Sequence, residues 1–226
     1  MTSTKFYGVG LPYRQIGELN GKLFVVEGPD GVGRSTHMAK LADWLESEGH
    51  ATSYTGFRRS ELTASGLEQA KRGHTLHRAT MSLFYATDFA DRLENHIIPA
   101  LRAGFYVLSD RYMYSIFARD IVRGADPEWL KRIYGFALVP DLVIYLKIPA
   151  ERLAPRVISG GGFDFWESGM DLKLADNLYD SFMIYQTRII QELDKMAEEY
   201  NFITIDASRD VEPVFEDIKT EISKVI

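Results

Sequence analysis

A glycine-rich segment near the N-terminus carries residues whose types and spacing could do chemistry. Residues 24–36 read FVVEGPDGVGRST and match the phosphate-binding pattern G-x-x-x-x-G-K-[ST] at every fixed position except the lysine, where Arg34 stands. Gly28, Gly31 and Gly33 let the backbone curl so that successive N–H groups point at phosphate oxygens at a helix N-terminus. The segment therefore predicts a site for a nucleoside triphosphate.

Two side chains of this segment have separate expected roles. Ser35 would place its hydroxyl on a Mg²⁺ ion, and Arg34 would lie along the β- and γ-phosphates, where lysine normally acts as a compact point charge. Arginine is always charged and binds phosphate through two N–H groups, but its guanidinium is bulkier and planar. Because Arg34 replaces the residue that touches the transferred group, a protein that binds nucleotide without transferring phosphate stays an alternative. A plain glycine turn with a surface arginine is a second alternative, which the apolar run before it and the amphipathic helix after it disfavour.

The composition restricts the class of protein. The chain has 226 residues, of which 46% are hydrophobic and 26% charged, enough for one α/β domain with a small mobile insert. A net charge of −6 argues against a nucleic-acid-binding face, and the lack of cysteine excludes disulfides, thiolate metal sites and cysteine nucleophiles. No apolar run approaches the about 18 residues that span a bilayer, and the first residues lack a signal-peptide core. We expect a cytoplasmic enzyme whose partners are small molecules, with no membrane and no nucleic acid.

Apolar runs typical of strands alternate with segments of helical periodicity, which predicts a parallel sheet with helices on both faces. The runs are 23–26, 52–55, 105–109, 142–148 and 202–205. Ligands of such sheets bind at the carboxyl ends of the strands, so we expect the loops that follow the runs to converge on one crevice. Residues 1–21 are expected to form an added arm or short hairpin before a single domain over 22–226.

The composition changes between residues 156 and 172. Three glycines at 160–162 precede Phe163, Phe165 and Trp166. A glycine hinge followed by aromatic residues predicts a lid that closes over a ligand, with a disordered surface loop as the alternative. A long amphipathic helix is expected from Leu174 to Tyr200, with Asp176 and Asp180 on its solvated face.

A second group of candidate residues follows the third apolar run. Asp110-Arg111-Tyr112 stands at its end, and Ser115 and Ala118 lie on the start of the next helix. An acid at a strand end can hold Mg²⁺ through water, and the adjacent arginine can grip the phosphate of an acceptor. A structural ion pair between Asp110 and Arg111 is the alternative.

Together with residues 84–88, 95–101 and 140–146, these motifs resemble the thymidylate kinase family. The resemblance runs from about residue 22 to 207, and its most specific parts are 27–33, the spacing of 110–118 and the Pro-Asp pair at 140–141. It implies a P-loop NTPase fold with a central parallel five-stranded sheet and a small lid, and a homodimer. It also implies transfer of the ATP γ-phosphate to the 5′-phosphate of dTMP in the presence of Mg²⁺.

The resemblance carries site roles to matching positions. Asp30 would contact the sugar hydroxyl and the metal region, Ser35 and Asp110 the Mg²⁺, and Arg111 the acceptor phosphate, while Tyr85 would stack on thymine. The residues expected at ATP are Gly28, Asp30, Gly31, Val32, Gly33, Arg34, Ser35, Thr36 and Arg156. The residues expected at the acceptor are Asp30, Phe57, Arg58, Tyr85, Phe89, Arg111, Ser115 and Arg119. Arg34, Arg58, Asp110 and Arg111 form the expected catalytic set.

The chain departs from the family pattern mainly around the base. The family's arginine on a thymine carbonyl aligns with Phe89, for which core packing is the alternative to ligand contact, and Arg92 on the same helix flank is a candidate replacement. A polar position that often faces the base is Ile116, and the family's Tyr-Gln pair is Arg119-Asp120.

The lid also departs from the family pattern. In many relatives the lid supplies an arginine to the transferring phosphoryl group, whereas residues 163–171 here include no basic side chain. Arg58 or Arg59 could stabilise the transferring phosphoryl group, with two solvated surface arginines as the alternative. These departures leave open a kinase of the same fold that acts on another nucleotide or a phosphorylated metabolite, and a nucleotide-binding regulatory protein with weak or no transfer.

Overall fold

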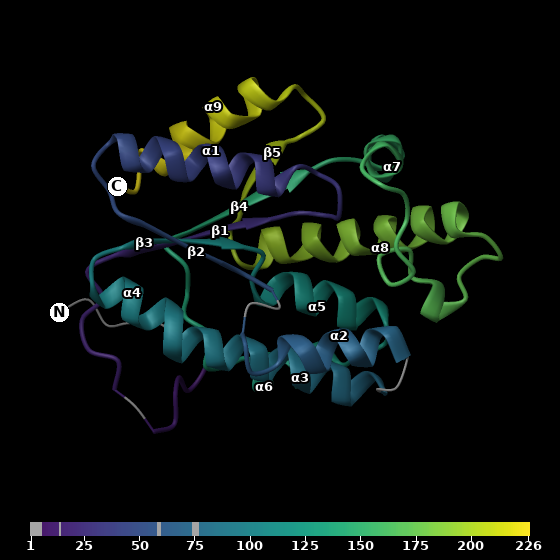
Figure 1. Ribbon diagram of the computed structural model, residues 1–226, viewed down its shortest axis with the longest axis horizontal. Helices are drawn as coiled ribbons and strands as arrows, with labels where there is room; N and C mark the ends of the chain where they lie inside the picture. Colours follow the sequence, from purple (N-terminus) through teal and green to yellow (C-terminus); the bar gives the residue numbers. More distant parts are fainter. Residues whose placement is uncertain (1–5, 14, 58–59, 74–76) are drawn as a thin grey trace.

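The computed structural model describes residues 6–13, 15–57, 60–73 and 77–226. Within these residues a five-stranded sheet forms the centre of the molecule, and all neighbouring strands pair in parallel in the order β2-β3-β1-β4-β5 (Figure 1). The strands are β1 Lys22–Glu27, β2 Thr52–Gly56, β3 Tyr106–Asp110, β4 Leu142–Lys147 and β5 Ile203–Asp206. The expected five-stranded parallel sheet is confirmed, and each apolar run overlaps one strand.

Helices cover both faces of the sheet, as expected (Figure 1). One face carries α1 (Arg34–Ser47) and α9 (Val211–Ile222). The other face carries α3 (Arg78–Arg92), α4 (Ile98–Arg102), α5 (Met113–Val122) and α6 (Pro127–Ile133), and α2 (Ala64–Gly73) packs on α3. A π-helical turn over Leu93–Ile97 joins α3 to α4. Helices α7 (Ala150–Ser159) and α8 (Leu178–Glu199) pack on each other, and a 3₁₀ turn over Met170–Leu172 precedes α8.

Two apolar cores lie on opposite sides of the sheet. Alternate residues of β1 divide between them, because successive strand side chains point to opposite faces. Val25 joins the core under α3, α4 and α5, whereas Phe24 and Val26 join the core under α1 and α9. A sheet buried on both faces needs apolar residues at every position, which explains why the strands appear in the sequence as continuous apolar runs.

The N-terminal arm lies along the side of the domain and runs beside α4 (Figure 1). Phe6 forms an isolated antiparallel bridge with Leu138, and the buried Ile16 carbonyl accepts a hydrogen bond from Arg102 Nε at 2.6 Å. The described arm residues form this isolated bridge and no β-hairpin.

The long helix begins later than its apolar periodicity indicates. Helix α8 starts at Leu178, because the Asn177 side chain accepts a hydrogen bond from the Asp180 backbone N–H at 2.8 Å and caps the helix. Residues 174–177 form the turn before it, so the expected start at Leu174 is wrong. Asp176 and Asp180 are exposed, as expected for a solvated face. In the described part of the chain no helix is long and apolar enough to cross a membrane.

Candidate active site

The glycine-rich loop joins β1 to α1 at the carboxyl edge of the sheet. Gly28 and Gly33 have φ angles of 153° and 100°, and a Cβ atom on Gly28 would lie 2.8 Å from the Leu146 carbonyl oxygen. Only glycine fits there without displacing β4. Ser35 and Thr36 are exposed in the first turn of α1, where backbone N–H groups lack partners within the helix. This end of the helix can therefore hold an anion.

Arg34 folds back across the loop and does not extend away from it. Its Nε donates to Asp110 Oδ1 at 2.7 Å, and its Nη1 donates to the carbonyl oxygens of Gly28 at 2.8 Å and Pro29 at 2.5 Å. Three bonds to a planar fork fix one orientation, which a single ammonium group would not reproduce. Arg34 thereby links the glycine loop to the end of β3.

Asp110 has the donor type and position that a magnesium site needs. Its second carboxylate oxygen accepts a hydrogen bond from Tyr54 Oη at 3.2 Å, and the exposed Ser35 hydroxyl lies on the first turn of α1. The described residues hold no cluster of three metal-ligating side chains. Mg²⁺ at phosphates is usually bound by one or two protein oxygens together with waters and the phosphates themselves. Ser35 and Asp110 fit that pattern and would hold the ion, and Asp110 Oδ1 also accepts the hydrogen bond from Arg34.

A buried ion cluster lies beside the loop and centres on Asp30. Arg111 Nη2 donates to Asp30 Oδ1, and Arg119 Nη2 lies 3.0 Å from both Asp30 oxygens. Burial alone would raise the pKa of Asp30, but the charges of Arg111, Arg119 and Arg34 outweigh it and hold the pKa well below its usual range. Arg111 and Arg119 thus share the Asp30 carboxylate, and both guanidinium groups lie where an anionic ligand could meet them.

Arg111 is held in a strained backbone conformation. It has a φ of 72° and is 7% exposed, and its Nη1 donates to Gly28 O at 3.1 Å and to Ser115 Oγ at 2.8 Å. A non-glycine residue at positive φ persists only where its surroundings fix it, and such residues gather at functional sites. Ser115, expected at the acceptor, contacts Arg111 directly.

Glu27 fixes this arrangement from below, and although it stands in the motif 27–33, sequence reasoning assigned it no role. The carboxylate is 0% exposed and accepts hydrogen bonds from Tyr112 N at 2.7 Å and Ser115 N at 3.3 Å, at the N-terminus of α5. Burial raises the pKa of Glu27, while Arg111 and these hydrogen bonds oppose the shift. Glu27 is therefore a positioning residue that ties the end of β1 to the turn carrying Arg111.

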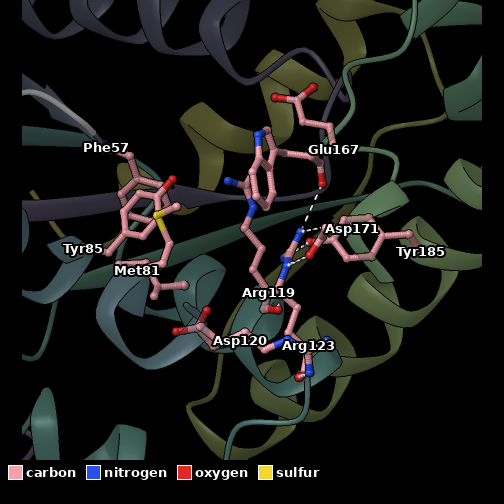
Figure 2. Close-up of a pocket in the computed structure, with 12 residues that line it drawn as sticks. Phe57, Met81, Tyr85, Arg119, Asp120, Arg123, Glu167, Asp171 and Tyr185 are labelled. Atoms are coloured by element: carbon pink, nitrogen blue, oxygen red, sulfur yellow. Dashed lines mark hydrogen bonds and ion pairs between the residues drawn. The ribbon is translucent and has the colours of Figure 1, made fainter. Parts of the chain in front are cut away.

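Two adjoining pockets open at this edge of the sheet. The charged pocket is lined by Asp30, Arg34, Tyr54, Asp110 and Arg111 among other residues. The apolar pocket is lined chiefly by Met81, Ile116, Trp166 and Tyr185, with Arg78, Asp120, Arg123 and Asp171 as its charged members (Figure 2). Phe57, Tyr85, Arg119 and Glu167 line both pockets. One ligand can therefore reach from one pocket into the other.

The walls of the apolar pocket suit a flat ring. Figure 2 shows Phe57, Met81 and Tyr85 on one side, and Asp171 and Tyr185 on the other. Aromatic and thioether side chains pack well against planar π-systems. The positions that α5 and its C-cap residue Arg123 contribute, 116, 119, 120 and 123, follow helical spacing and lie on one helix face. Phe57, Tyr85 and Arg119, expected at the acceptor, thus lie together.

The segment after α7 covers this pocket and is fastened to α5. Arg123 Nε and Nη2 donate to the two Asp171 oxygens at 2.9 and 3.1 Å, and its Nη1 donates to Tyr185 Oη at 2.5 Å. Arg123 Nη2 also donates to the Trp166 carbonyl at 3.2 Å. We call the contact between Arg123 and Asp171 the lid latch. Sequence reasoning did not single out Arg123, although its helical spacing from Ile116 and Arg119 is a usable signal.

The lid brings an acid, Glu167, to the phosphate side of the site. The nearby Asp30 charge, followed by burial, raises the pKa of Glu167, whereas Arg119 lowers it. Glu167 lines both pockets, so its charge faces the place where a phosphate would lie. No basic side chain lies between residues 163 and 171 of the lid, all of which the structure describes.

Three expected site residues lie elsewhere or outside the described chain. Phe89 is 0% exposed and packs against Tyr112 and Tyr134 with ring centroids 4.8 and 5.5 Å away, so it belongs to the core and lines neither pocket. Arg92 is 3% exposed and pairs with Asp88 at 2.9 Å, so it does not take the place of the missing base-binding arginine. Arg58 lies outside the described residues.

Arg156 is placed beside the glycine loop. Its Nη1 donates to the Val32 carbonyl at 3.4 Å, which brings the last turns of α7 over residues 31–33. A Cβ on Gly31 would lie 2.6 Å from Val157 Cγ2, so the loop and α7 are in close contact. Arg156, expected at ATP, thus lies next to the loop on which the ATP phosphates are expected.

Comparison with known proteins agrees with the geometry of the site. A family model described as thymidylate kinase matches residues 26–218. The chain belongs to the thymidylate kinase family. A relative named "Probable thymidylate kinase 2" from Saccharolobus solfataricus is 38% identical over 215 residues, covering 92% of this chain and 98% of the relative. A "Probable thymidylate kinase" of Thermococcus gammatolerans is 31% identical over 208 residues, covering 88% of this chain and 94% of the relative. A "Thymidylate kinase" of Brachyspira hyodysenteriae is 32% identical over 167 residues, covering 73% and 82%.

Proposed function

We propose that the protein is an ATP-dependent dTMP kinase, which moves the γ-phosphate of ATP to dTMP and releases ADP and dTDP. The observation that carries the proposal is the continuity of the two pockets through Phe57, Tyr85, Arg119 and Glu167. A nucleoside monophosphate has an anionic end and a flat ring, and this pair of pockets offers a charged end, with three arginines among its described residues, and an apolar slot at one place.

The chemistry needs charge and position more than a reactive side chain. A phosphate oxygen of dTMP attacks the γ-phosphorus, a new P–O bond forms, and the bond to the oxygen bridging the β- and γ-phosphorus breaks. The acceptor oxygen is already ionised, so no general base is required. Two anions must be brought together, and cationic groups lower that cost.

The basic residues divide this task by position. Arg34 lies at the glycine loop, where it would hold the β- and γ-phosphates, with Asp110 fixing its orientation. Arg111 and Arg119, which share Asp30, would hold the acceptor phosphate. Arg58 stays a candidate for the transferring phosphoryl group, since the lid offers no arginine there.

Ser35 and Asp110 are the residues that would hold Mg²⁺, which when bound neutralises charge on the β- and γ-phosphates. The family resemblance also implies a homodimer, which light scattering on purified protein would test. A cytoplasmic location stays a prediction.

The test is an assay of ADP release with Mg²⁺ and ATP over a panel of deoxynucleoside monophosphates. We expect dTMP to give the highest kcat/KM. ADP release that dTMP does not accelerate would overturn the proposal, and turnover confined to another monophosphate would reassign the acceptor.

A further inference from the structure

Asp120 supplies a carboxylate inside the apolar pocket. It lies on the pocket-facing side of α5, one turn after Ile116, and Figure 2 shows it next to Arg119, below the wall of Met81 and Tyr85 and the wall of Asp171 and Tyr185. The residue is only partly exposed. A charged group in such an apolar slot is costly unless hydrogen bonds satisfy it.

The neighbours of Asp120 satisfy only part of this carboxylate. The Ser82 hydroxyl donates to Asp120 Oδ2, and among the described residues no hydrogen bond is made to Oδ1. Nearby cations are engaged by other acids: Arg123 is bound to Asp171, and Arg119 to Asp30. Burial raises the pKa of Asp120, although the Ser82 hydrogen bond and the two arginine charges oppose the shift. An N–H group of a ligand in the pocket could therefore donate a hydrogen bond to Asp120 Oδ1.

Arg78, an exposed residue, provides the opposite polarity in the lining of the same pocket. It begins α3, and its Nη1 donates to the Arg123 carbonyl at 2.6 Å, three residues after Asp120. Arg78 and Asp120 both line the apolar pocket. The lining of the apolar pocket thus includes one acceptor group, Asp120, and one donor group, Arg78.

We propose that Asp120 reads the acceptor base, with its carboxylate accepting the N3–H of thymine while Arg78 donates to the neighbouring ring carbonyl. The inference rests on the proposed dTMP kinase function and adds the residues that choose the base. Cytosine presents the reversed pattern at this edge, an acceptor at N3 and an amino group at C4. It therefore places acceptor against Asp120 and donor against Arg78, and both contacts are unfavourable.

Uracil has the same N3–H and C4 carbonyl as thymine, so Asp120 cannot distinguish dUMP from dTMP. Selection for the 5-methyl group must come from apolar lining such as Met81 or Phe57. Substitution of Asp120 should therefore affect dTMP and dUMP alike and change their ratio little, while the ratio of dCMP to dTMP changes.

The experiment measures kcat/KM for dTMP, dUMP and dCMP in the wild type and in Asp120→Asn. The exposed carboxylate of Glu128 on α6, which pairs with Lys131 at 3.1 Å, offers the matched control Glu128→Gln. We expect Asp120→Asn to lower kcat/KM for dTMP and dUMP roughly 10-fold, because the amide oxygen can still accept the N3–H but the hydrogen bond is no longer charge-assisted. The dCMP-to-dTMP ratio should rise at least about 10-fold, because an amide can donate to N3 of cytosine.

A second measurement uses the wild-type protein and the N3-methylated analogue of dTMP, so that poor folding of a variant cannot hide the answer. We expect kcat/KM for the analogue to be at least about 10-fold below that for dTMP, and the gap to narrow in Asp120→Ala. An equal loss on all three nucleotides in Asp120→Asn, or wild-type turnover of the analogue at the dTMP rate, would overturn the base-reading role. Absence of any wild-type dTMP turnover is a different result and would overturn the proposed function itself.

Discussion

The charged pocket and the apolar pocket meet at Arg119 and Glu167 but are built in different ways. The charged pocket takes four of its six described charged side chains from two short segments at the ends of strands, Asp30 and Arg34 after β1 and Asp110 and Arg111 at the end of β3, while α5 and the lid add Arg119 and Glu167. The apolar pocket takes one side chain or a few from the loop after β2, from α3, from α5, from the lid and from α8. Phosphate binding depends on backbone geometry at a strand end, so the residues that it needs are close together in the sequence and form a recognisable motif. Binding of a flat ring needs walls from separate elements, which leave no contiguous signature.

The largest expected effect concerns Arg34 in the charged pocket. We expect Arg34→Ala to abolish phosphoryl transfer, a loss of ~10³-fold or more in kcat, because it removes the charge at the β- and γ-phosphates. Arg34→Lys should retain part of the activity, since it keeps the charge but loses the fork that binds Asp110 and two loop carbonyls. Single-turnover ADP formation measures both. Undiminished transfer in Arg34→Ala would remove this residue from the mechanism.

Arg111 is the next test of the charged pocket. Arg111→Ala should lower kcat/KM for dTMP by ~10²-fold or more while changing the KM for ATP little, because the guanidinium belongs to the acceptor side. Arg188→Ala, at an exposed position of α8, is the matched control. Arg111→Ala also leaves Arg119 as the ion-pair partner of Asp30, so the thermal unfolding of Arg111→Ala should be measured together with its kinetics. Equal effects on ATP and dTMP would contradict the division between donor and acceptor arginines.

The lid latch tests the apolar pocket. Asp171→Asn removes the charge that binds Arg123 through two hydrogen bonds, and we expect the KM for dTMP to rise roughly 5- to 30-fold, corresponding to ~1–2 kcal/mol. Asp176→Asn changes an exposed acid in the turn before α8 and should leave the KM unchanged. A KM for dTMP within about 2-fold of the wild type would contradict a role of the latch in closing the pocket over the base.

The smallest expected effect is at Glu167, where the two pockets meet. The raised pKa of Glu167 means that the folded protein disfavours the ionised side chain. Ionisation of Glu167 at higher pH therefore lowers the free energy of unfolding, and protonation at lower pH removes this loss. Glu167→Gln should therefore raise Tm by about 1–3 °C at pH 8, and the difference should shrink as the pH falls toward about 4. Differential scanning fluorimetry across that range measures it. A lower Tm of Glu167→Gln than of the wild type at pH 8 would contradict the assignment of the contact between Glu167 and Asp30 as destabilising.

The same contrast explains how much the sequence could predict. The strands, the glycine loop and Asp110-Arg111 could be predicted because each depends on neighbouring residues. The partner of Arg34 could not, since Asp110 lies 76 residues away and only the fold brings them together. Arg123 and Asp120 stand at helical spacing after Ile116, but that spacing alone does not reveal which face of α5 meets the lid. Phe89 shows the reverse case, because alignment placed it at the base and packing against Tyr112 and Tyr134 places it in the core.

The most direct measurement is a crystal structure of the protein with ADP, Mg²⁺ and dTMP. We expect the dTMP phosphate within hydrogen-bond distance of Arg111 in the charged pocket. The thymine ring should lie in the apolar pocket beside Tyr85, with N3 facing Asp120. A dTMP molecule whose ring lies outside the apolar pocket, or whose phosphate is held away from Arg111, would contradict the assignment of one pocket to phosphate and the other to the base.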